Sequence, residues 1–285
     1  TMTYKIIGDS CLDLTEDMKQ DSRFETVPLT LQVGDQIVAD DEHFDQAGFL
    51  SMVKACPQCP KTACPSPELF LEKYRQAGTD VIFVITMSCH LSGSYNSAAA
   101  ASQMYQEELQ EKGETGSRVE VIDSLSASSG QMAVALYIQG LCEAGLEADE
   151  VLSQALEYRD RMNTYFVLET LETLRKNGRL SGLQAFFATA LNIKPVMGAD
   201  RGTIVKLDQA RGMSKALQRM CAIAVSKGGD TLKKTAVIAH CNNRQRAEFV
   251  KEQLCSLARF GRIVITETAG VATLYAGDGG IVLAF

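Results

Sequence analysis

The consecutive apolar residues Val81 to Ile85 limit what this chain can fold into. Because polar side chains do not alternate with the apolar ones, the strand that this run predicts is buried on both faces. A turn rich in hydroxyl side chains follows, and then a helical segment from Ser94 to Lys112. A strand, a turn and a helix in this order are typical of a mostly parallel sheet that helices cover on both faces.

Two further predicted strand ends in the first half of the chain carry similar polar residues. They are Asp9-Ser10 and Asp123-Ser124 with Ser126, which match the composition of the turn from Ser88 to Ser94. Ligands of mostly parallel sheets bind at the carboxyl ends of the strands. The coincidence therefore predicts a ligand site where these strand ends meet.

Shorter signals predict other elements of the first half. Asp13-Leu14-Thr15-Glu16 fits a capping box that opens a helix. Gly34-Asp35 fits the turn of a hairpin. Ser66 and Pro67 fit the N-cap and the first position of another helix.

The pattern changes near Ala148. We expect a strand, a hairpin, and two amphipathic helices around a further strand, at residues 164–168, 196–207, 213–227, 245–258 and 236–239. Antiparallel strands of this kind indicate a second domain, so the expected fold class is α/β with two domains. The first is an N-terminal α/β/α domain of residues 1–150 with a mostly parallel sheet, and the second a C-terminal α/β domain of residues 151–285.

Composition and charge argue against several classes of protein. The net charge of −7 argues against nucleic-acid binding, which needs clustered Lys and Arg. The apolar runs are shorter than the ~20 residues of a membrane span, and we expect no signal peptide. Nine scattered cysteines are typical of reduced thiols, so we expect a cytoplasmic protein. The Cys56-Pro-Gln-Cys59 segment, with Cys64 nearby, lacks the further ligands of a closed zinc site, so we expect no metal. The chain also lacks the glycine-rich motifs of nucleotide sites, and we expect no cofactor.

The residues alone leave two interpretations of the turn Ser92-Gly93-Ser94 open. A serine there can cap the following helix. Alternatively, the free N–H groups at the helix start can bind a carboxylate or phosphate, which Gly93 lets the backbone approach closely. A hydrolase or small-molecule phosphotransferase that uses Ser92, with His90 as the nearest base, is a rival hypothesis. The chain lacks the G-x-S-x-G motif and the glycine-rich phosphate loops that would favour it.

Two residues elsewhere also suit an anion. Thr62 lies in a proline-rich loop and has no evident structural task. Arg179 follows the helix stop at Asn177-Gly178, where it is either a surface residue or a guanidinium directed at a carboxylate or phosphate.

In combination, these segments resemble the DegV family of bacterial fatty-acid-binding proteins. The matching stretches occur in the family's order and span nearly the whole chain: GDSCLDL (8–14), VPL (27–29), TACPSP (62–67), LSGSYNSA (91–98), VIDSLSASSG (121–130), LETLRKNGRLSG (171–182) and NIKPV (192–196). The resemblance implies a two-domain DegV-like fold with one long-chain fatty acid buried between the domains.

The resemblance also implies a function and a site. The protein is expected to be a lipid carrier without catalytic residues, which presents the acid to a partner fatty acid kinase for acyl-phosphate formation in phospholipid synthesis. Thr62 and Ser92 are expected to hold the carboxylate, with backbone donors at Gly93 and Ser94, and Arg179 to lie near it. A peripheral encounter with a membrane is compatible with such a carrier.

One segment is a candidate for contact with the acyl chain, and one residue departs from the family pattern. Residues 185–191, which include Phe186 and Phe187, form either a wall of the acyl site or an ordinary core helix. Tyr275 stands where the family usually has a histidine. A tyrosine can contact the carboxylate as a hydrogen-bond donor but carries no positive charge, so the resemblance does not define its effect on phosphoryl transfer.

Overall fold

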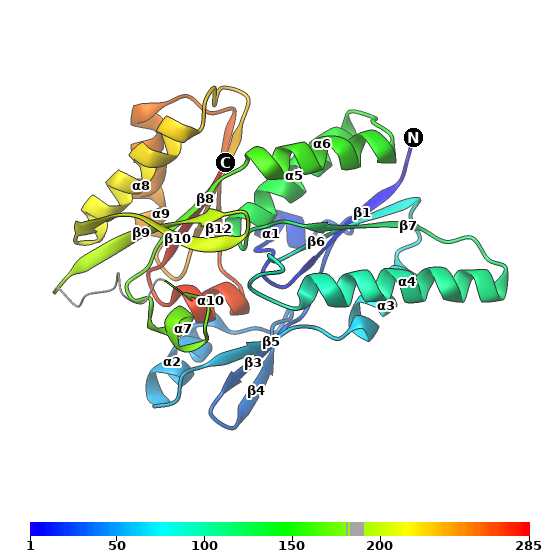
Figure 1. Cartoon of the computed structure of the whole chain (residues 1–285), viewed down its shortest axis with the longest axis horizontal. Coiled ribbons are helices and arrows are strands. Elements are labelled where there is room, and N and C mark those ends of the chain that lie inside the picture. Colours follow the sequence, from blue (N-terminus) through cyan, green and yellow to red (C-terminus); the bar gives the residue numbers. More distant parts are fainter. Residues whose placement is uncertain (181, 183–190) are drawn as a thin grey trace.

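The computed structural model describes residues 1–180, 182 and 191–285, and these residues form three β-sheets (Figure 1). The strands are β1 Tyr4–Asp9, β2 Phe24–Val27, β3 Thr30–Val33, β4 Gln36–Ala39, β5 Lys61–Ala63, β6 Val81–Thr86, β7 Arg118–Asp123, β8 Thr164–Val167, β9 Ile193–Asp200, β10 Thr203–Arg211, β11 Thr235–His240, β12 Arg262–Glu267 and β13 Ile281–Ala284. The helices are α1 Glu16–Lys19, α2 Gln46–Ala55, α3 Pro67–Gln76, α4 Ser94–Lys112, α5 Ser129–Glu143, α6 Ala148–Arg161, α7 Glu172–Lys176, α8 Met213–Lys227, α9 Arg244–Leu257 and α10 Gly270–Ala276.

The first sheet has the order β2-β1-β6-β7, and its strands pair in parallel. Strand β6 is buried along its whole length, because α3 and α4 pack on one face of the sheet and α5 and α6 on the other. In Figure 1 these two helix pairs lie on opposite sides of the strands. The parallel sheet that the run Val81 to Ile85 predicts is thus confirmed, as is the α/β class.

The second sheet has the order β10-β9-β8-β13-β11-β12 and mixes parallel with antiparallel pairs. Helices α8 and α9 cover one face. Helix α5 packs against the other face, where its residues share a core with Val237 and Ala284. One helix therefore touches both sheets. The strands of the two sheets lie in residues 4–123 and 164–284, and the domain boundary at residue 150 stays a prediction.

The third sheet, in the order β4-β3-β5, carries the hairpin that Gly34-Asp35 predicts. Strand β5 pairs with β3, which places Thr62 opposite Leu31 in the register. Helix α10 packs against α2 and β3 beside this sheet. The proline-rich loop is thereby fixed next to α10.

The helix starts differ from the expectations in two places. Asp13 is not part of a capping box, since Thr15 is the N-cap of α1 and its hydroxyl accepts the N–H of Met18 at 3.3 Å. The cap of α4 is Gly93 rather than a serine. Ser66 is the N-cap of α3 as expected, although its side chain makes no capping bond.

Membrane spanning can be judged from helix length and hydropathy. Within residues 1–180, 182 and 191–285, no helix combines the length and apolar character needed to cross a bilayer.

Candidate functional site

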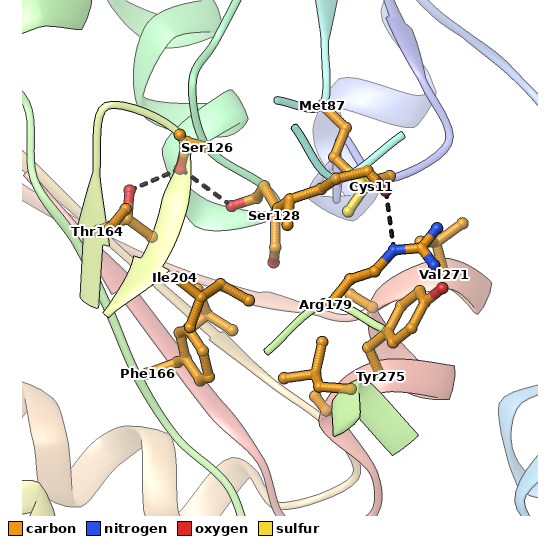
Figure 2. Close-up of a pocket in the computed structure, with 18 of the residues that line it drawn as sticks. Cys11, Met87, Ser126, Ser128, Thr164, Phe166, Arg179, Ile204, Val271 and Tyr275 are labelled. Atoms are coloured by element: carbon orange, nitrogen blue, oxygen red, sulfur yellow. Dashed lines mark hydrogen bonds between the residues drawn. The ribbon is translucent and has the colours of Figure 1, made fainter. Parts of the chain in front are cut away.

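An apolar cavity of about 110 Å³ lies between loops of the first sheet and one face of the second sheet (Figure 2). This volume is several times the ~10–15 Å³ that one water molecule needs. Loops after β1, β6 and β7 form one wall, and strands β8, β9, β10 and β13 with helix α10 form the other. Among the lining side chains are Met87, Leu125, Phe166, Leu168, Ile204 and Val271.

Polar side chains from distant segments meet at one end of this cavity. The Thr62 hydroxyl lies 2.9 Å from the Tyr275 hydroxyl. The Arg179 guanidinium lies over the Tyr275 ring, 5.9 Å from its centre. Arg179 Nε donates to the carbonyl oxygen of Leu91 at 3.0 Å, which joins it to the turn before α4.

That turn presents two hydroxyl groups. The oxygens of Ser92 and Ser94 lie 3.0 Å apart, and the backbone N–H of Ser94 donates to the Ser92 oxygen at 3.2 Å. A Cβ atom on Gly93 would lie only 2.9 Å from the Cys64 sulfur. A glycine therefore lets the proline-rich loop approach the turn. We call Thr62, Ser92, Gly93, Ser94, Arg179 and Tyr275 the polar cluster.

The structure thus places every residue of the polar cluster in one region. Arg179, Tyr275 and the neighbouring Leu91 line the cavity, whereas Thr62 and residues 92–94 are not among its lining residues. Asn177 fixes this arrangement, because its side-chain amide donates to the Pro60 carbonyl at 2.9 Å. Arg179 is half-buried rather than a free surface residue. The binding roles of these residues remain predictions.

Most of the predicted acyl-site wall, residues 185–191, falls outside the part of the chain that the structure describes. Residues 185–190, including Phe186 and Phe187, lie outside the described residues. Leu191 is 88% exposed and does not line the cavity.

The other strand ends that the sequence singled out have mainly structural partners. Asp9 accepts the backbone N–H groups of Met87 and Cys11, at 2.7 and 3.0 Å. The Ser10 hydroxyl accepts the N–H of Leu29 at 2.9 Å. Asp123 accepts the N–H of Leu125 at 2.9 Å. These carboxylates and hydroxyls stabilise loops, whereas Ser126, which follows β7, lines the cavity.

Two buried carboxyl groups that sequence reasoning did not connect with the site hold the start of α10. Asp40 accepts the N–H groups of Gly270 and Val271 at 2.8 and 2.9 Å. Asp13 accepts the N–H of Ala269 at 2.7 Å and the Ser128 hydroxyl at 2.6 Å. Burial raises the pKa of Asp13 to about 7 and that of Asp40 to about 6, although these hydrogen bonds act in the opposite direction.

A serine hydrolase would need a base at Ser92. The recorded partners of the Ser92 side chain in the described part of the chain are the hydroxyl and N–H of Ser94. His90 is exposed, and its backbone N–H donates to the Ser88 hydroxyl at 3.2 Å. The geometry therefore offers no observation in favour of the hydrolase hypothesis.

The comparison with known families gives one match over almost the whole chain. The model of the family described as "Uncharacterised protein, DegV family" matches residues 3–285. A DegV domain-containing protein of Streptococcus pyogenes is 36% identical over 287 aligned positions, which cover 100% of this chain and 99% of the relative.

Solved structures are similar over the same extent. A DegV family protein from Ruminococcus gnavus, whose crystal structure was refined with vaccenic acid, has a TM-score of 0.95 and 40% identity, with 100% of both chains covered. The Streptococcus pneumoniae Fatty Acid Kinase (Fak) B3 protein, loaded with linoleic acid, has a TM-score of 0.86 and 32% identity. That alignment covers 100% of this chain and 99% of the other.

Proposed function

The chain belongs to the DegV family, and we propose that it binds one long-chain fatty acid, with the acyl chain in the apolar cavity and the carboxylate at the polar cluster. One observation carries the proposal: Arg179 and Tyr275 line an apolar cavity and also contact Thr62 and the turn before Ser92. An amphiphile with one anionic end matches this arrangement. The ligands of the similar R. gnavus and S. pneumoniae proteins support it.

The energetics favour the same orientation. Each CH₂ group that enters the apolar cavity contributes about 0.8 kcal/mol. A carboxylate loses hydration when it binds, so directed donors must replace the water. Thr62, Tyr275 and Ser92 offer hydroxyl groups, Gly93 offers a backbone N–H group near the start of α4, and Arg179 offers a positive charge. The Ser94 N–H, which donates to the Ser92 oxygen in this structure, could turn to the carboxylate if Ser92 does.

We further propose that the protein presents the bound carboxylate to a kinase, which transfers the terminal phosphoryl group of its nucleotide and forms an acyl phosphate. The chain has no glycine-rich phosphate loop of its own. The name of the S. pneumoniae relative, a fatty acid kinase B protein, supports this role. The lipid-binding protein would then supply the acceptor, and a separate chain the nucleotide.

Native mass spectrometry of the purified full-length chain, before and after loading with stearic acid, tests the binding proposal. A stoichiometric C14–C18 acid is the expected ligand. Thr62→Ala and Ser92→Ala should each weaken retention by roughly 1–3 kcal/mol, the cost of a hydrogen bond to a charged group. Ser97→Ala, one turn farther along α4, is the matched control and should retain the acid like the wild type.

The result that would sink the binding proposal is a protein that never carries a fatty acid, even after loading. The kinase proposal has a separate test, in which the loaded protein, ATP and a fatty acid kinase from the same organism are incubated with hydroxylamine. Acyl phosphate is then trapped as a hydroxamate. A protein that retains its acid but never yields hydroxamate contradicts presentation and leaves binding intact.

A further inference from the structure

The cavity wall carries buried hydroxyl groups at a distance from the polar cluster. Ser126, Ser128 and Thr164 line the cavity and are only 4%, 2% and 8% exposed. Figure 2 shows Ser126 and Thr164 across the cavity from Arg179 and Tyr275. Hydroxyl groups are costly in a wall that otherwise contacts an alkyl chain, so each needs a partner.

The proton of each of these hydroxyl groups is directed at another group of the protein. Ser128 donates to the Asp13 carboxylate at 2.6 Å. Ser126 and Thr164 share one hydrogen bond of 2.6 Å. The remaining proton of this pair is directed at the Ala127 carbonyl, 3.5 Å from the Ser126 oxygen, or at the Met162 sulfur, 3.4 Å from the Thr164 oxygen.

The oxygens of these hydroxyl groups can still accept hydrogen bonds. A hydroxyl group has one proton and two lone pairs. The Ser126–Thr164 pair therefore uses both of its protons but only one of its four lone pairs in the hydrogen bonds recorded between described residues. The group that could complete such a pair is a hydrogen-bond donor in the cavity.

The surrounding backbone makes room for this pair. A Cβ atom on Gly130, in the first turn of α5, would lie 1.8 Å from the Ser126 oxygen and 2.7 Å from the Thr164 oxygen. In the preceding loop, Leu125 and Ser128 adopt positive φ angles of 51° and 54°, which cost energy for residues other than glycine. The fold thus accommodates two hydroxyl groups where an apolar pair would suit an alkyl chain better.

We infer that the cavity accepts an acyl chain that carries a hydroxyl group, whose O–H donates to the Ser126–Thr164 pair. This inference rests on the proposed fatty-acid binding. An unsubstituted alkyl chain offers the pair no donor, whereas a hydroxyl in a wholly apolar cavity would lose its hydration without compensation. The pair therefore acts as a specificity element for hydroxylated fatty acids.

The test compares stearic acid with 10-hydroxystearic and 12-hydroxystearic acid on the delipidated full-length chain, by measuring the Kd of each. In the wild type, the better of the two hydroxy acids should bind within threefold of stearic acid or more tightly. We define the affinity ratio as the affinity for that hydroxy acid divided by the affinity for stearic acid. In the Ser126→Ala/Thr164→Val double variant, this ratio should fall at least tenfold, because both acceptors are removed together. Affinity for stearic acid should rise, since the wall becomes more apolar.

Two further variants separate recognition from a structural effect. Thr164→Ser keeps the hydroxyl and should keep the wild-type ratio, which tests the inference even if the double variant does not fold. Thr266→Val is the matched control, because the Thr266 hydroxyl is buried and donates to the Asp13 carbonyl at 2.9 Å but does not line the cavity. Its ratio should equal that of the wild type.

Two outcomes would overturn the inference while stearic acid still binds. One is a wild type that rejects both hydroxy acids by more than tenfold. The other is a folded double variant that keeps the wild-type ratio. A wild type that binds none of the three acids would instead refute the proposed function, and this inference with it.

Discussion

The two ends of helix α10 are held by different kinds of hydrogen bond. At its start, the carboxyl groups of Asp13 and Asp40 are completely buried and accept backbone N–H groups. Near its other end, the half-buried hydroxyl of Tyr275 pairs with that of Thr62 beside the cavity. Carboxylates that satisfy backbone groups cannot be released without exposing those groups, whereas paired hydroxyls can exchange partners with a ligand. We therefore expect the first end to serve stability and the second to serve the proposed binding.

The largest effect that this comparison predicts is a loss of stability as the pH rises. The unfolded chain releases the protons of Asp13 and Asp40 near pH 3.8, whereas the folded protein holds them up to about pH 7 and pH 6. The stability that these groups contribute is present below about pH 4 and disappears as the pH rises through these values. Between the pKa of the unfolded chain and that of the folded protein, each such carboxyl group lowers the free energy of unfolding by about 1.4 kcal/mol for every unit that the pH rises. For Asp13 the total is on the order of 4 kcal/mol.

Urea unfolding of the wild type and Asp13→Asn between pH 4 and 8 measures this dependence. The asparagine cannot titrate, so the slope of the free energy of unfolding against pH should become shallower by about one proton. Equal slopes for the two proteins would show that Asp13 is not the titrating group.

The next largest effect is expected for Asp40→Ala. This change leaves the N–H groups of Gly270 and Val271 buried without an acceptor. The free energy of unfolding should fall by roughly 3 kcal/mol. Urea titration at pH 7.5 measures the difference, with the exposed neighbour Glu42→Ala as the control that should change it by less than about 0.5 kcal/mol. A variant as stable as that control would break the assignment of this end to stability.

The smallest effect is expected at the other end of the helix, for Tyr275→Phe. The substitution removes the hydroxyl that pairs with Thr62 but keeps the ring beneath Arg179. Affinity for stearic acid should fall about three- to tenfold, which corresponds to roughly 1 kcal/mol, and the free energy of unfolding should change little. Isothermal titration and urea unfolding of the same variant test both statements. If Tyr275→Phe instead lowers the free energy of unfolding and leaves the affinity for stearic acid unchanged, this end of α10 serves stability rather than binding.

The sequence predicts the first sheet well because its signals are local. The uninterrupted apolar run of β6 and the hydroxyl-rich turn before α4 identify a buried strand and the helix after it, and α4 has the predicted bounds of Ser94 and Lys112. Helix α10 escapes such reasoning. Its N-cap Ala269 makes no side-chain capping bond, and its first N–H groups are satisfied by carboxylates 230 or more positions earlier in the chain.

The candidate site was predictable in part for the same reason. Thr62, Ser92 and Arg179 stand out by residue type and local pattern and Tyr275 only through the family resemblance, and the structure places the four together. Of the cavity wall, the hydroxyl-rich strand end with Ser126 was anticipated, whereas the strand residues Thr164 and Phe166 carry no signal of their own. They become lining residues because β8 of the second sheet faces the loop after β7 of the first sheet at the cavity.

The position of β13 in the second sheet has a consequence for synthesis on the ribosome. Strand β13 lies between β8 and β11, yet it is translated after every other strand of that sheet. Until residues 281–284 emerge from the exit tunnel, the nascent chain cannot join β8 to β11, and both strands present unpaired edges that favour aggregation. Val282 also lines the cavity. A chain shortened before β13 should therefore lack both the central strand of this sheet and part of the cavity wall.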